Sequence, residues 1–205
     1  MSNQDQFIDE GYIKYNINWI NEVLPIAVPN QLMHWRDKMH ELKQIGHYAD
    51  INIGYGNISV KTTKGFLISG TQTGDVYPIQ PEHFTLVTDY DIEANSVTCK
   101  GEIKASSESM THAAVYEADE AINAIIHIHN QKLWEKLMDN VPTTKKEVPY
   151  GTPEMANEIF RLFKETAVQQ EKIIVMAGHD EGIISFGKDL EEAGEILLNF
   201  LAKFN

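Results

Sequence analysis

The chain has 205 residues, 42% hydrophobic and 23% charged, which is typical of a folded globular protein. Its net charge of −13 argues against nucleic acid or an anionic membrane as partner, because both recruit basic surfaces. The sequence shows no signal or transit peptide, no apolar run long enough to span a bilayer, and a single cysteine, Cys99. We therefore expect a cytoplasmic protein whose residues 1–205 form one domain. A small anionic substrate is compatible with the net charge, because backbone N–H groups can bind it locally.

The first elements in chain order are predicted to be helices. Apolar side chains recur at helical spacing from Phe7 to Leu24, and Pro25 ends the run. A second helix is expected from a cap at Asn30 to Gly46. Its buried face is expected to hold Leu32, Met39, Leu42 and Ile45.

The middle of the chain is predicted to form antiparallel strands. A glycine-rich turn at residues 54–57 precedes a hairpin with strands at 58–61 and 66–69. Two more strands are expected at residues 84–91 and 96–100. Strands that follow one another without intervening helices favour an antiparallel sheet over a parallel one.

A helix is predicted to open at Lys104–Glu108 and to run to about Ala118. Ser106 and Ser107 can cap this helix, because their hydroxyls accept hydrogen bonds from its first N–H groups. The same N–H groups and the positive end of the helix dipole also attract anions. Both interpretations of the serines, a cap and an anion site, stay open at this point.

The segment 124–129 is rich in isoleucine and free of glycine and proline, which predicts a buried strand. Successive strand side chains point to opposite faces, so His127 and His129 share one face while Ile126 and Ile128 occupy the other. Two imidazoles in this arrangement can bind one divalent metal ion, usually Zn²⁺. A pair of hydrogen-bonded core histidines is the second interpretation of this pattern.

The remaining elements complete the fold prediction. Helices are expected at residues 131–138, 153–166 and 190–204, and strands at 173–176 and 183–186. His179 follows the first of these strands directly and can supply the third imidazole of a metal site. We predict an α/β fold, a single three-layer α/β/α domain with helices on both faces of a largely antiparallel sheet.

In this order, the motifs resemble the class II aldolase/adducin family, which includes fuculose-phosphate aldolase, ribulose-phosphate 4-epimerase and methylthioribulose-phosphate dehydratase. The resemblance spans residues 32–198 and leaves residues 1–28 outside it as an N-terminal helical extension. It is carried by Gly56–Lys61, Phe66–Gly70 with Thr73–Gly74, Ser106–Glu108, His112 with Tyr116, His127–His129, Pro149–Glu154, His179–Gly182 and Gly187–Ala193.

The resemblance implies a role for each part of the site. His127, His129 and His179 correspond to the ligands of Zn²⁺ or another divalent metal, and Glu108 to the catalytic carboxylate beside it. His112 is expected to pack behind the site. The expected phosphate-binding residues are Gly56, Asn57, Thr73, Gly74, Ser106 and Ser107, with Ser69–Gly70 an alternative to Thr73–Gly74. The family also implies a homotetramer with its active site at a subunit boundary.

The implied function is that of a metal-dependent lyase acting on a small phosphorylated sugar or keto compound. The metal would stabilise an ene-diolate during aldol cleavage or dehydration, and Glu108 would carry the proton as general acid and base. Family epimerases have Asp in place of this Glu, so Glu108 favours a lyase over a sugar-phosphate epimerase. A non-catalytic module like the adducin head and a structural metal site are two further hypotheses, although a structural zinc site normally has four protein ligands.

Two features depart from the family pattern. The turn His179–Gly182 is two residues longer than the usual His-Gly. The stretch between His129 and Tyr150 is shorter than in the aldolases, and no tyrosine follows Tyr150. The aldolase tyrosines that handle the aldehyde half of the substrate therefore have no counterparts here, which leaves the identity of the substrate open.

Overall fold

The computed structural model describes residues 11–204 and has a mixed α/β fold. The strands of the main sheet are β1 (Asn16–Asn21), β4 (Asn57–Thr62), β5 (Gly65–Ser69), β6 (Phe84–Asp91), β7 (Ser96–Gly101), β8 (Ala124–His129), β9 (Ile173–Val175) and β10 (Gly182–Gly187). Their order across the sheet is β1-β7-β6-β5-β4-β8-β10-β9. Neighbours are antiparallel except β1 and β7, which are parallel. The largely antiparallel sheet predicted from the sequence is confirmed.

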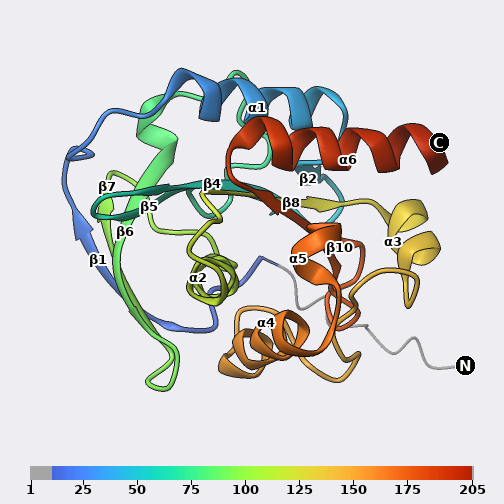
Figure 1. Cartoon of the computed structure of the whole chain (residues 1–205). Coiled ribbons are helices and arrows are strands. Elements are labelled where there is room, and N and C mark those ends of the chain that lie inside the picture. Colours follow the sequence, from blue (N-terminus) through green and yellow to red (C-terminus); the bar gives the residue numbers. More distant parts are fainter. Residues whose placement is uncertain (1–10, 205) are drawn as a thin grey trace, which may run out of the picture.

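Helices cover both faces of this sheet. They are α1 (Asn30–Glu41), α2 (Ser109–Ala118), α3 (Gln131–Leu137), α4 (Pro153–Glu165), α5 (Val168–Glu171) and α6 (Leu190–Phe204). Figure 1 shows α1 and α6 above the sheet and α2 and α4 below it. The predicted three-layer arrangement is therefore confirmed. No helix within residues 11–204 is both long enough and apolar enough to cross a membrane.

The alternating side chains of β8 divide the core into two parts. Ile125 packs in the cluster that contains apolar residues of α2 and α4. Ile126 and Ile128 pack in the opposite cluster, with apolar residues of α1, α3 and α6. Because β8 pairs with β4 on one edge and β10 on the other, its backbone is satisfied by hydrogen bonds deep inside the protein. This central strand supplies two of the predicted site residues.

Side-chain caps define where two helices begin. The side chain of Asn130 accepts a hydrogen bond from the N–H of Leu133 at 2.9 Å, so β8 ends at His129 and α3 starts directly after it. Thr152 caps α4 by accepting from the N–H of Met155 at 3.3 Å, with Pro153 in the first turn. The predicted boundaries of these helices are confirmed to within one residue.

The predicted N-terminal helix from Phe7 to Leu24 is wrong over its described part. Its first residues, 7–10, lie outside the described range, and residues 16–21 form β1, which pairs with β7 at the edge of the main sheet. In β1, Ile17 and Trp19 are partly buried against the core while Asn16 and Asn18 are exposed. That alternation has the strand period of two, and pairing with β7 satisfies it better than a helix would.

The second predicted helix is shorter than expected. It ends at Glu41, and Lys43 has a φ of 58°, which takes the chain out of the helix. Leu42, predicted to be buried, is 43% exposed, whereas the three other predicted core positions of this helix are buried. The residues that follow form a two-stranded sheet of β2 (Gly46–Tyr48) and β3 (Ile53–Tyr55), which the sequence did not predict.

One partly buried ion-pair network holds the loop between α3 and α4. Both carboxylate oxygens of Glu158 accept hydrogen bonds from Arg161, and Glu158 also accepts from the backbone N–H of Lys145 at 3.0 Å. These contacts lower the pKa of Glu158 to about 2, the hydrogen bonds from Arg161 contributing most. The carboxylate thus ties helix α4 to the loop that leads toward Tyr150.

We predict that Glu158→Gln lowers the free energy of unfolding by about 1–3 kcal/mol at neutral pH. Because the folded-state pKa lies below the ordinary value of 4.5, this stabilisation is present above pH 4.5 and is lost as the pH falls toward about 2. Urea denaturation across this pH range measures it. Glu165→Gln is the matched control, since Glu165 is 55% exposed and pairs with the same arginine at 3.6 Å. If Glu158→Gln lowered the free energy of unfolding equally at every pH, the stabilisation would not come from the ionised carboxylate of Glu158.

Candidate metal and substrate site

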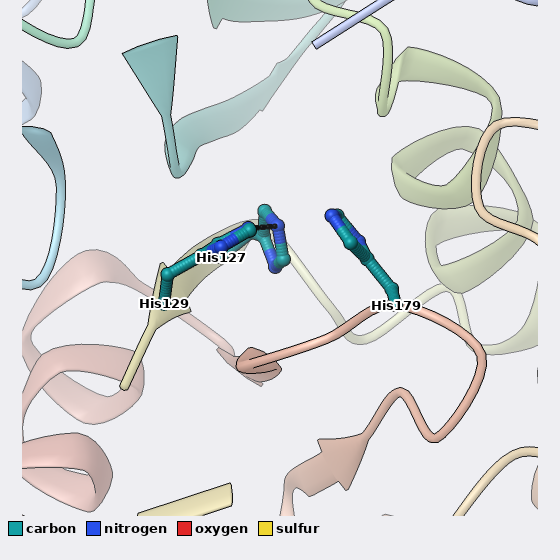
Figure 2. A group of neighbouring side chains, drawn as sticks. All are labelled: His127, His129 and His179. Carbon is teal, nitrogen blue, oxygen red and sulfur yellow. Dashed lines mark hydrogen bonds between the residues drawn. The ribbon is translucent and has the colours of Figure 1, made fainter. Parts of the chain in front are cut away.

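Three histidines converge at the end of the central strand. His127 and His129 project from the same face of β8, as predicted, and their Nε2 atoms lie 3.2 Å apart. His179 comes from the turn between β9 and β10, and its ring centroid lies 5.2 Å from that of His127 and 4.7 Å from that of His129. Figure 2 shows the three rings directed toward one another. One ligand atom from each histidine lies within 4.8 Å of the others.

The environment keeps these imidazoles in the form that binds metal. Burial, and then the neighbouring histidines, hold the pKa values of His127 and His129 well below the ordinary value, so both rings are neutral. Nδ1 of His127 lies 3.2 Å from the carbonyl oxygen of Ile183, to which it can donate. Its Nε2 then presents a lone pair. Three buried, convergent imidazoles fit a divalent metal such as Zn²⁺.

Glu108 lies beside the histidines. It is the residue before α2, it is only 1% exposed, and its Oε1 is 3.5 Å from Nδ1 of His179. The preceding loop is fixed by Ser106, whose backbone oxygen accepts hydrogen bonds from the hydroxyls of Tyr15 and Ser109, both at 2.7 Å. The predicted neighbourhood of carboxylate and imidazoles therefore exists in the structure.

One pocket brings the other predicted site residues together. Its lining includes all six predicted phosphate-binding residues together with Glu108, His127 and His179. Backbone of the glycine-rich loops forms much of the wall, and a Cβ on Gly74 would lie 1.8 Å from the carbonyl oxygen of Gly46. Such loops can direct N–H groups at an anion without help from net positive charge. Gly70 also lines the pocket, whereas the buried side chain of Ser69 accepts a hydrogen bond from the N–H of Ile58 at 3.2 Å.

A buried arginine holds the second loop of this pocket in place. Arg36 of α1 is 1% exposed and donates to the backbone carbonyls of Thr73, Gly74 and Val76. The carbonyl oxygen of Thr73 also accepts from the N–H of Val76 at 3.1 Å, so the guanidinium adds to the hydrogen bonds that hold this turn. The sequence did not predict this role for Arg36, because nothing in the local pattern of a helix indicates a distant loop as its partner.

His112 lies behind the site, in agreement with its predicted role. Its Nδ1 is 2.7 Å from the hydroxyl of Ser59, which is also 2.7 Å from the hydroxyl of Tyr116. Burial lowers the pKa of His112 to about 3, so the ring is neutral. The hydrogen bond between His112 and Ser59 connects α2 to β4, and His112 is outside the group of three convergent histidines.

Aromatic residues that the sequence did not assign to the site surround the histidines. Tyr150 stacks on His179 with ring centroids 4.4 Å apart, and the ammonium of Lys14 lies 3.8 Å from the Tyr150 ring centre. Tyr48 and Tyr55, from the β2–β3 pair, lie against the ring of His129. The β2–β3 segments carry no motif, so only the tertiary structure reveals them, whereas Tyr150 lies within a stretch that carries the family resemblance.

Comparisons with known proteins identify the family of this chain. The model of the class II aldolase and adducin N-terminal domain matches residues 42–200. An L-fuculose phosphate aldolase from Methanocaldococcus jannaschii is 31% identical over 174 residues, which cover 72% of this chain and 87% of that protein. An L-fuculose phosphate aldolase from Methanococcus maripaludis is 30% identical over 153 residues, which cover 67% of this chain and 75% of that protein. A solved L-fuculose 1-phosphate aldolase shares the fold, with a TM-score of 0.64 at 21% identity over 87% of this chain and 85% of that one. The chain belongs to the class II aldolase and adducin N-terminal domain family.

Proposed function

We propose that this chain is a divalent-metal-dependent lyase that acts on a small phosphorylated sugar or keto compound. The observation that carries the proposal is a single pocket that combines convergent imidazoles, a buried carboxylate and glycine-rich loops. The family match and the two aldolase relatives identify the chain as an aldolase-type enzyme. A non-catalytic module has no need of an open three-histidine site beside a buried carboxylate.

Each part of the pocket has a distinct task in this proposal. His127, His129 and His179 would hold the metal, which supplies a Lewis acid for the substrate's carbonyl and adjacent hydroxyl oxygens. The loops at residues 56–57, 73–74 and 106–107 bind the phosphate through backbone N–H and hydroxyl groups and so orient the substrate. Glu108, next to His179, takes a proton from the substrate carbon or oxygen that faces it and returns it later.

We propose a phosphorylated ketose similar to fuculose phosphate as the substrate, with aldol cleavage or dehydration as the reaction. The relatives named as L-fuculose phosphate aldolases support the substrate class, and Glu108 favours a lyase over an epimerase. The side of the site next to His179 is formed by Tyr150 and by Lys14 from the N-terminal segment. Through this stacking, Tyr150 would orient His179, the ligand from the turn between β9 and β10.

We predict that His127, His129 and His179 together bind one Zn²⁺ per chain. The triple His→Ala variant should lose the metal, because no lone pairs then converge, while His34→Ala on the exposed face of α1 should retain it. Elemental analysis of the purified proteins measures metal per chain. Full metal content in the triple variant would contradict the proposed ligands.

We predict that Glu108→Gln slows proton abstraction by roughly 10²–10⁴-fold and leaves metal content and folding nearly unchanged. The amide keeps the shape of the side chain but removes the base. Solvent-deuterium exchange into a phosphorylated ketose reports this step even when the true carbonyl partner is unknown. Glu102→Gln, at an exposed position before α2, is the control. If Glu108→Gln exchanged deuterium into the ketose as fast as the parent protein, Glu108 would not be the base.

We also propose a cytoplasmic homotetramer with its active site at a subunit boundary, from the similarity to the family. Cys99, which is buried as a free thiol, is compatible with a reducing compartment. Light scattering during gel filtration should report the mass of four chains. A monomer that turns over substrate at full rate would contradict the tetramer and the shared site.

A further inference from the structure

We propose that Tyr48 and Glu181 are positioning residues that fix His129 as a metal ligand. The hydroxyl of Tyr48 lies 2.7 Å from Oε2 of Glu181 and 3.1 Å from Nδ1 of His129. Tyr48 comes from β2, and Glu181 comes from the turn that carries His179. The inference rests on the metal site proposed above and explains how this chain selects the metal-binding form of one ligand.

The direction of the hydrogen bonds follows from the chemistry of the groups. An ionised carboxylate can only accept, so the Tyr48 hydroxyl donates its proton to Glu181. The Tyr48 oxygen then offers its lone pairs to Nδ1 of His129, and that nitrogen must carry the proton to form a hydrogen bond. A neutral imidazole with its proton on Nδ1 has its lone pair on Nε2. Glu181 and Tyr48 thus set the tautomer of His129 from outside the metal site.

His127 has its proton on Nδ1 as well, so the Nε2 atoms of both histidines lack a proton. His127 donates from Nδ1 to the carbonyl oxygen of Ile183, so its Nε2 also carries a lone pair. The two Nε2 atoms lie 3.2 Å apart, and with these two tautomers neither of them carries a proton. That spacing is close to the ~3.3 Å between two nitrogens that each lie about 2.0–2.1 Å from a tetrahedral ion. A cation relieves the repulsion between the lone pairs, whereas a hydrogen-bonded core pair would need a proton on one Nε2.

A tight turn fixes the position of Glu181. The N–H of Gly182 donates to the oxygen of His179 at 2.9 Å, which closes a tight turn. Glu181 has a φ of 65°, a left-handed conformation that glycine adopts without cost and glutamate does not. Its backbone oxygen accepts from the N–H of Asn130 at 3.0 Å, which ties the turn to the end of β8.

The role of Glu181 also accounts for the two additional residues, Asp180 and Glu181, between His179 and Gly182. Asp180 is exposed, whereas Glu181 is partly buried and points back to Tyr48. A direct His-Gly connection has no position from which a carboxylate could reach the β2–β3 pair. The two additional residues therefore supply an outer hydrogen-bond partner for His129, the kind of partner that typically changes metal affinity about 10–100-fold.

The experiment measures zinc affinity by competition with a chromophoric chelator, and the melting temperature of the metal-free protein, for three variants. Tyr48→Phe should raise the zinc Kd by about 10–100-fold, because Nδ1 of His129 loses its acceptor. Glu181→Gly should raise Kd in the same range while keeping or raising the melting temperature, because glycine relieves the turn. Tyr77→Phe removes an exposed tyrosine–glutamate hydrogen bond of 2.6 Å to Glu41 and should leave Kd unchanged.

Nitrogen-15 NMR of the imidazoles in the metal-free protein supplies a second readout. The parent should show His129 protonated at Nδ1, and Tyr48→Phe should shift it toward the other tautomer. Unchanged zinc affinity in both Tyr48→Phe and Glu181→Gly would overturn this inference alone and leave the metal site intact. A parent protein that binds no zinc would overturn the metal site and this inference together. If Tyr48→Phe does not fold, Glu181→Gly still decides between the two outcomes.

Discussion

The burial of neutral imidazoles on a central strand is the constraint on which the rest of the site depends. β8 is paired on both edges, and His127 and His129 are at most 4% exposed, so neither ring can gain a proton without a large desolvation cost. Each neutral ring has one nitrogen with a lone pair that needs a partner, and one ligand atom of each of the two histidines lies within 4.8 Å of a ligand atom of His179. A divalent metal ion held by these imidazoles would satisfy their lone pairs, and it would also compensate the charge of the neighbouring Glu108 carboxylate, which is buried beside them.

The part of the pocket proposed to bind phosphate is built from backbone loops, which would allow an acidic chain to bind an anion. Its walls are loops of small residues, and a side chain at Gly74 would collide with the backbone of β2. The buried guanidinium of Arg36 holds one of these loops through its carbonyl oxygens. In the proposed function, backbone N–H groups held in this way would bind the phosphate locally, where the net charge of −13 matters less than the local dipoles.

The sequence predicted the elements whose signals are local and agree with the tertiary structure. The isoleucine-rich run of β8 and the helical patterns of α3 and α4 indicate their conformations directly, and the structure adds side-chain caps at Asn130 and Thr152. The strand β1 was missed because its apolar spacing also fits a helix, and pairing with β7 decides between the two. Tyr48 was missed because it reaches His129 across 81 positions of the chain, and no spacing rule covers such a contact.

The central claim is that three imidazoles of this chain bind one metal ion and leave a coordination position open. X-ray absorption at the zinc edge of the loaded protein tests it most directly, because it reports the number and kind of ligands. We predict three imidazole nitrogens at about 2.0–2.1 Å and one exchangeable oxygen. A coordination sphere that contains sulfur, or four protein ligands and no exchangeable oxygen, would contradict the claim.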